Sequence, residues 1–109
     1  MTDHPQVALL FNGRPVQVDV GMAELVHALW AYGIETAYSC QGDPDGDSED
    51  PAALAYVAFA SPADTARFAA RVARGRPGWL WVTEHEVAGG RDSVHLPPAD
   101  LLWLCTQFT

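Results

Sequence analysis

The chain contains no lysine: its six basic residues are all arginine, against fourteen acidic residues and a net charge of −8. Because duplex binding depends on neutralising phosphates, this balance argues against a nucleic-acid partner. The sequence also lacks a run of about 18 apolar residues, the length that spans a membrane. Its first residues lack the basic and apolar regions of a secretion signal. We therefore expect a cytoplasmic protein with no membrane partner.

Cysteine is scarce as well, since Cys40 and Cys105 permit a single intramolecular bridge. In a cytoplasmic protein we expect both to be reduced thiols. The sequence has no C-x-x-C or H-x-x-x-H pair, no phosphate-binding glycine loop and no serine nucleophile elbow. These absences leave no motif for a particular reaction, and we predict no cofactor and no metal ligand set.

What remains is the composition of one folded domain. The chain has 109 residues, 49% of them apolar, which is enough for one core and too little for two. We assign residues 1–109 to a single α+β domain. Hydrophobic periodicity predicts strands at 7–11, 16–20, 35–40, 54–60, 79–87 and 92–96, and helices at 21–32, 62–74 and from 98 onward.

Local signals set several boundaries of these elements. Asn12-Gly13 favours a tight hairpin between the first two strands. Gly33 is placed to end the first helix in the left-handed conformation. Ser61 precedes a proline and an acidic residue, which is typical of a helix N-terminus.

The order of elements from 16 to 87 is β-α-β-β-α-β. It predicts a ferredoxin-like split β-α-β unit with an added N-terminal strand, a C-terminal β-hairpin strand and a C-terminal helix. Alternation turns Val57, Phe59, Leu80 and Val82 towards the helices. The opposite side then carries a candidate interaction face of Tyr38, Tyr56, Trp79 and Trp81. Either the last helix or a second subunit should cover this face, so a homodimer or a protein partner is one prediction.

The most distinctive local feature is a candidate pocket made of Ser39, Cys40, Gln41 and Gly42. A cysteine at a strand end, followed by glycine, can present its sulfur in an open backbone pocket. A nucleophilic thiol needs a lowered pKa, usually from an imidazole, and the sequence offers His27, His85 and His95. The acidic residues that follow would instead raise the pKa. A half-buried structural cysteine is the ordinary alternative.

The charged segments have plain interpretations. The acidic segment from Asp43 to Asp50 departs from a calcium loop, because its glycine falls at position 4 and no glutamate follows at position 12. We interpret it as a solvated loop, with weak divalent-cation binding as the alternative. The arginine cluster of residues 67, 71, 74 and 76 indicates a solvated face or an anion or partner site. A hairpin at Gly89-Gly90 places Glu84 opposite His95 and predicts a cross-strand ion pair.

Several segments resemble an uncharacterised family of small bacterial and phage proteins. The resemblance rests on the motif G-I-x-T-x-x-S-C-Q from Gly33 to Gln41. It extends to the valine-aspartate end of the second strand, to Ala55–Phe59 and to the segment from Leu96 to Asp100. The family has no assigned activity, so the resemblance implies a fold and directs attention to Ser39, Cys40 and Gln41.

These observations favour a small acidic binding or regulatory module over a catalyst. One alternative is an enzyme or metal-binding protein centred on Cys40, with a histidine and acidic side chains. Another is an acidic inhibitor of a basic partner.

Overall fold

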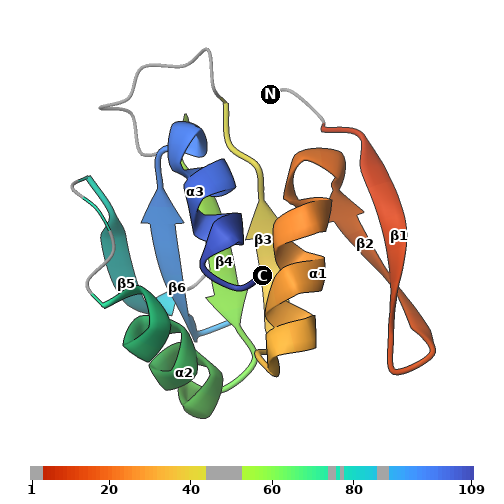
Figure 1. The fold of residues 1–109 in the computed structure, drawn as a ribbon, viewed down its shortest axis with the longest axis horizontal. Coiled ribbons are helices and arrows are strands. Elements are labelled where there is room, and N and C mark those ends of the chain that lie inside the picture. The colour runs from red at the N-terminus through yellow and green to blue at the C-terminus, as the bar shows by residue number, and fades with distance from the viewer. Residues whose placement is uncertain (1–3, 44–52, 74–75, 77, 86–88) are drawn as a thin grey trace.

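The computed structural model describes residues 4–43, 53–73, 76, 78–85 and 89–109, with Glu84 and His85 described by their backbone. Its strands are β1 (Gln6–Phe11), β2 (Arg14–Asp19), β3 (Thr36–Cys40), β4 (Ala55–Phe59), β5 (Leu80–His85) and β6 (Arg91–Leu96). Its helices are α1 (Ala23–Tyr32), α2 (Pro62–Val72) and α3 (Leu101–Thr106), with 3-10 turns at Val20–Met22 and Pro98–Asp100 (Figure 1). The predicted α+β class is confirmed.

The strands form two antiparallel sheets. β1 and β2 make a separate hairpin, and the other four strands make one sheet in the order β3-β4-β6-β5. The three helices lie on one side of this sheet, and the hairpin stands beside α1 and β3 (Figure 1). The far side of the sheet carries no described helix. We call it the open face.

The predicted hairpin and helix ends are confirmed. Asn12 and Gly13 both have positive φ, as a tight two-residue turn requires, and Phe11 pairs with Arg14 across it. Gly33 has φ +98° and ends α1, while the amide of Ile34 donates to the carbonyl of Leu29. At α2, the Ser61 hydroxyl accepts from an amide of the first turn.

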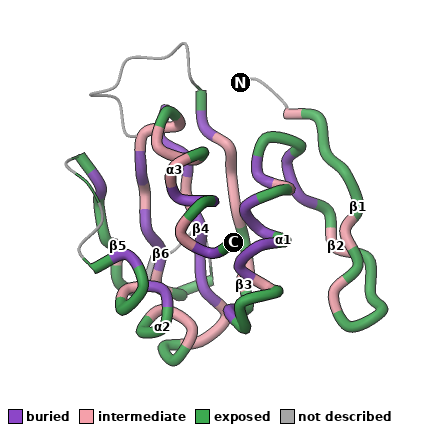
Figure 2. Tube along the Cα trace, viewed as in Figure 1, coloured by how far each residue is buried: buried purple, intermediate pink, exposed green. Residues whose placement is uncertain are grey.

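The core lies between the helices and the sheet. Phe68 on α2 is fully buried and lies against the rings of Phe59, Trp81 and Phe108. Figure 2 shows burial concentrated in β4, β6, α1 and α3, whereas β1 and much of β5 are exposed. Phe108 follows α3 and belongs to the core, so the C-terminal helix completes the helix layer and does not cover the open face.

The strand order departs from the ferredoxin-like prediction. That unit would place β2 between β4 and β5, but β6 occupies this position and β2 pairs with β1 instead. The tight turn at Asn12-Gly13 pairs β2 with β1. β6 supplies the central strand in its place, with Val94 and Leu96 fully buried.

The predicted facing of β5 is wrong. Trp81 pairs with Val94 and contacts Phe68, and Trp79 is buried against Trp103, so both tryptophans lie on the helix side. Leu80 and Val82, which alternation turned towards the helices, pair with His95 and Ser93 on the open face. A shift of one residue in phase moves every side chain of a strand to the other face. Val57 and Phe59 do lie in the core as predicted.

The predicted pairing of Glu84 with His95 is also wrong. Leu80 lies opposite His95, and a register shift between Val82 and His85 brings His85 opposite Arg91. His85 and Arg91 enclose five residues, whereas a two-residue hairpin at Gly89-Gly90 would pair 88 with 91, so the observed pairs are displaced from that simple register. The side chains of Glu84 and Glu86 lie outside the described residues.

Candidate functional site: His4, Asp19 and Cys40

Cys40 belongs to a row of side chains that crosses the open face. It pairs with Tyr56 on β4, which pairs with His95 on β6. Directly opposed residues of antiparallel strands point to the same side of the sheet. The rings of Tyr56 and His95 stack at 5.2 Å, and the Ser93 hydroxyl lies 2.9 Å from Nε2 of His95. Cys40 is half-buried at one end of this row.

The four residues of the predicted pocket have different positions. Ser39 pairs with Val57, a core residue, and therefore lies on the helix side, away from Cys40. Gln41 links the end of β3 to the end of β2 and to the 3-10 turn that follows it. Its side-chain oxygen accepts a hydrogen bond from the amide of Gly21 at 2.8 Å, and its own amide donates to Oδ2 of Asp19 at 3.0 Å. Only Cys40 presents a reactive atom to the open face from this set of four.

Gly42 allows the chain to pass close to the backbone that precedes β4. It is buried with φ +71°, and a Cβ built there would lie 2.6 Å from both the Ala53 carbonyl oxygen and the Ala55 amide nitrogen. No side chain fits at this position. Gly42 therefore shapes the site through the backbone and adds no chemical group to it.

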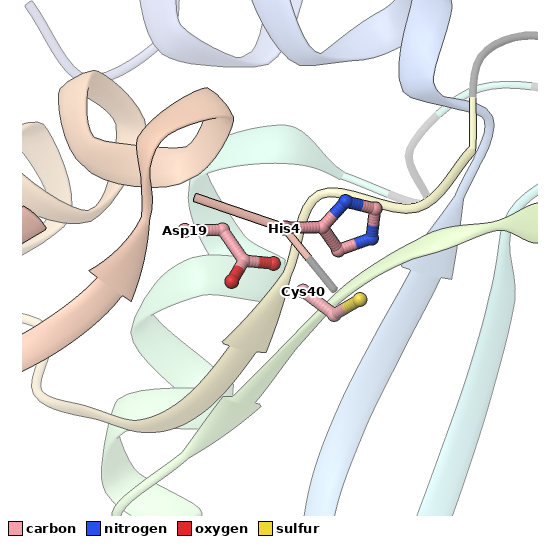
Figure 3. A group of neighbouring side chains, drawn as sticks. All are labelled: His4, Asp19 and Cys40. Atoms are coloured by element: carbon pink, nitrogen blue, oxygen red, sulfur yellow. The ribbon is translucent and has the colours of Figure 1, made fainter. Parts of the chain in front are cut away.

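Two residues that the sequence did not assign to the site complete it. His4, which precedes β1, and Asp19, the last residue of β2, approach Cys40 at the end of β3 (Figure 3). One ligand atom from each of the three lies within 4.8 Å of the other two. Figure 3 shows the side chains converging from three separate segments. An imidazole, a carboxylate and a thiol thus share one corner of the molecule.

Asp19 is held firmly in this corner. It is 6% exposed, and its two carboxylate oxygens accept hydrogen bonds from different groups. Oδ1 accepts from the side-chain amide of Gln6 at 3.2 Å, and Oδ2 accepts from the backbone amide of Gln41. The bond from Gln6 lies within the hairpin, and the bond from Gln41 ties the hairpin to the end of β3. They also fix the orientation of the carboxylate, which retains lone pairs for a further partner.

The corner favours the protonated forms of Cys40 and Tyr56. Burial raises the pKa of the Cys40 thiol, and the charge and hydrogen bond of Asp19 raise it further, while a backbone hydrogen bond from Gly42 partly opposes them. Burial also raises the pKa of Tyr56, with added contributions from Cys40, Asp19 and Tyr38. A thiol placed against a carboxylate holds its proton more tightly than a free cysteine does.

Two of the three histidines named from the sequence have described side chains, and neither lies beside Cys40 as a catalytic pair would require. His27 is exposed on α1, and His95 is separated from Cys40 by Tyr56 along the row. The side chain of His85 lies outside the described residues. His4 could have been found from the hairpin, because counting outward from Asn12-Gly13 puts Gln6 opposite Asp19. One further hydrogen bond, from the amide of Val20 to the carbonyl of Pro5, extends that pairing towards His4.

Other predicted features lie elsewhere. Of the candidate interaction face, Tyr38 and Tyr56 lie on the open face, and Trp79 and Trp81 do not. The acidic segment after Asp43, residues 44–50, lies outside the described residues. Cys105 is a free thiol buried in α3, on the opposite side of the sheet from Cys40, which is also free. Among the described residues, no helix is long and apolar enough to cross a membrane.

Comparison with known proteins adds no relative. No protein-family model matches the chain, no curated protein matches it, and no solved structure matches it. The site is therefore interpreted from its own geometry.

Proposed function

We propose that this chain is a small binding module that holds a zinc-class divalent cation between His4, Asp19 and Cys40. The observation that carries the proposal is the gathering of three ligand atoms, one each of nitrogen, oxygen and sulfur, within 4.8 Å of one another. This placement supports the alternative of a metal-binding protein centred on Cys40. It also fits the broader expectation of a binding or regulatory module.

The size of the cluster suits a tetrahedral ion. Zinc binds these ligands at about 2.0–2.3 Å, which sets ligand-to-ligand separations of roughly 3.3–3.6 Å. The longest distance between two of the three ligand atoms would have to shorten by little more than about 1 Å, and rotation of the side chains supplies this movement. His4 lies outside the regular strands, so it is the ligand most free to move.

The chemistry of the donors selects the ion. Thiolate and imidazole favour zinc and other transition metals, whereas calcium and magnesium prefer oxygen ligands. A bound cation would also resolve the electrostatic conflict between the thiol and the Asp19 carboxylate, because it stabilises both as anions. The hydrogen bonds that Asp19 accepts from Gln6 and Gln41 match the outer contacts that orient metal ligands.

A nucleophilic role for Cys40 has less support. Such a role needs a thiolate near neutral pH, and the surroundings of Cys40 raise the pKa of its thiol. Three protein ligands leave a fourth position for water or for a ligand group, which is also the arrangement of catalytic zinc. The site can therefore bind a small molecule through the ion, and this is the form of binding that we favour.

The test is a zinc titration of chelator-stripped, reduced protein against a chromogenic chelator. We expect one zinc per chain, and we expect magnesium to compete poorly. Removing a ligand by His4→Ala or Cys40→Ser should weaken binding by at least about a hundredfold, since even outer partners of a metal site contribute about 10–100-fold.

Matched controls use the other copies of the same residue types. His27→Ala removes an exposed histidine of α1, and Cys105→Ser removes the buried cysteine of α3. Both should retain the zinc affinity of the parent. Circular dichroism checks that each variant is folded, and His4→Ala keeps the test decisive if Cys40→Ser unfolds. Equal affinity in the parent and the ligand variants would overturn the proposal.

The other expectations stay predictions. They are membership of the bacterial and phage family, a cytoplasmic location, a homodimer or protein partner, and the inhibitor alternative. A partner at the open face would contact Tyr38 and Leu80, which are 49% and 48% exposed, and not the tryptophans first assigned to it. Analytical ultracentrifugation of the parent and of Leu80→Glu distinguishes a dimer through this face from a monomer.

A further inference from the structure

Arg67 and Arg71 form a pair of positive charges on an acidic protein. They lie four residues apart on α2 and therefore share one face of the helix. Among the described residues, neither guanidinium lies within ion-pair distance of a carboxylate, whereas Arg76 pairs with Asp100 at 3.7 Å. Like charges at this spacing destabilise a helix slightly. Within the described residues, the pair therefore has no compensating carboxylate.

Both side chains are held in place by backbone carbonyls. Nη1 of Arg67 donates to the Gly33 oxygen at 2.9 Å, and Nε of Arg71 donates to the Gln107 oxygen at 2.7 Å. Each bond uses one of the five N–H donors of a guanidinium, so most donors stay available to a ligand. Fixing the side chains in advance lowers the entropy cost of binding.

An aromatic ring lies beside the arginines. Tyr32 is 46% exposed, its ring packs edge-on against Phe108 at 5.2 Å, and the Arg71 guanidinium carbon lies 5.6 Å from the ring centre. Tyr32, Arg67, Ala70 and Arg71 line an open hollow of about 460 Å³. This volume is within the range of small-molecule sites.

We propose that this hollow binds a small molecule that carries a phosphate or carboxylate group next to a planar ring. Guanidinium groups match the geometry of both oxyanions and bind them through charge-assisted hydrogen bonds. The ring of the ligand would pack against Tyr32. The hollow lies on the helix side of the sheet, so this proposal is independent of the zinc site.

The experiment is a titration of the full chain with phenyl phosphate and with benzoate, followed by calorimetry or NMR shifts, with phenol as the uncharged comparator. We expect at least one of the two anions to bind about tenfold more tightly than phenol, with an affinity that falls as salt is added. The tighter anion identifies the oxyanion. Equal binding of phenol and both anions would overturn the proposal.

Variants locate the binding. The double substitution Arg67→Gln and Arg71→Gln should weaken the anion by at least about tenfold, because it removes both guanidinium groups. Arg14→Gln, on the hairpin, is the matched control and should leave the affinity unchanged. If the double variant unfolds, Arg71→Lys replaces it: the charge stays but the planar fork is lost, and binding should weaken severalfold. Unchanged binding in the α2 variants, or an equal loss in Arg14→Gln, would contradict the site.

Discussion

Trp79, which directly precedes β5, and Leu80, the first residue of β5, lie on opposite sides of the sheet, and alanine substitutions distinguish these sides. Trp79 is 8% exposed, meets the Trp103 ring edge-on at 6.0 Å and donates from its indole nitrogen to Oδ2 of Asp100 at 2.8 Å. Leu80 is 48% exposed and lies opposite His95 on the open face. The structure therefore predicts a large loss of stability at one position and a small loss at the next.

The magnitudes follow from burial. Replacing a buried tryptophan by alanine costs about 3–5 kcal/mol. Full burial of a leucine contributes about 1.5–3 kcal/mol, so a half-exposed Leu80 should cost about 1 kcal/mol. The difference of about 2–4 kcal/mol corresponds to urea midpoints at least about 1 M apart, for a slope of about 1–2 kcal/mol/M.

Urea unfolding followed by far-ultraviolet circular dichroism measures this difference without depending on tryptophan fluorescence. Leu102→Ala is the control, because Leu102 is 75% exposed on α3 and should change stability by no more than about 0.5 kcal/mol. A Leu80→Ala variant that loses as much stability as Trp79→Ala would refute the facing of β5. The tryptophans would then lie on the open face.

Three further predictions concern the end of β3 and its thiol. Gly42→Ala should destabilise the fold by at least about 2 kcal/mol, because alanine is strained at φ +71° and its Cβ would meet backbone atoms at 2.6 Å. An unchanged urea midpoint would contradict this prediction. In stripped protein, Cys40 should react with iodoacetamide more slowly than free cysteine at about pH 8, since its raised pKa leaves less thiolate, and faster alkylation would contradict it. The free energy of unfolding should fall as pH rises above about 8.5, because the pKa values of Cys40 and Cys105 are raised in the folded chain and both thiols ionise first in the unfolded chain. A urea midpoint that rises with pH over this range would contradict the prediction.

Much of the fold could be predicted from short-range patterns. Asn12-Gly13, Gly33 and Ser61 act through their own backbone geometry and nearest neighbours, so their elements begin or end where the sequence indicates. The facing of β5 could not be read in the same way. Residues 79 to 82 are all apolar, and such a run fits either phase of a strand.

Strand order and the site depend on long-range pairing. β6 reads as polar at Arg91, Asp92 and Ser93, which is typical of an edge strand, yet it lies between β4 and β5. The motif around Cys40 directed attention to the right strand end. Counting from Asn12-Gly13 brings His4 towards Asp19, but no spacing rule joins either residue to Cys40, which they meet only after the hairpin packs beside β3.

The measurement that tests the central claim most directly is the absorption spectrum of stripped protein titrated with cobalt(II), which occupies zinc sites and reports a bound thiolate by a charge-transfer band. A metal site at His4, Asp19 and Cys40 predicts a band that saturates at one equivalent, persists in Cys105→Ser and disappears in Cys40→Ser. It also predicts a much weaker band in His4→Ala at the same cobalt concentration. No band in the parent, or a band that survives Cys40→Ser and disappears in Cys105→Ser, would contradict a metal site at His4, Asp19 and Cys40.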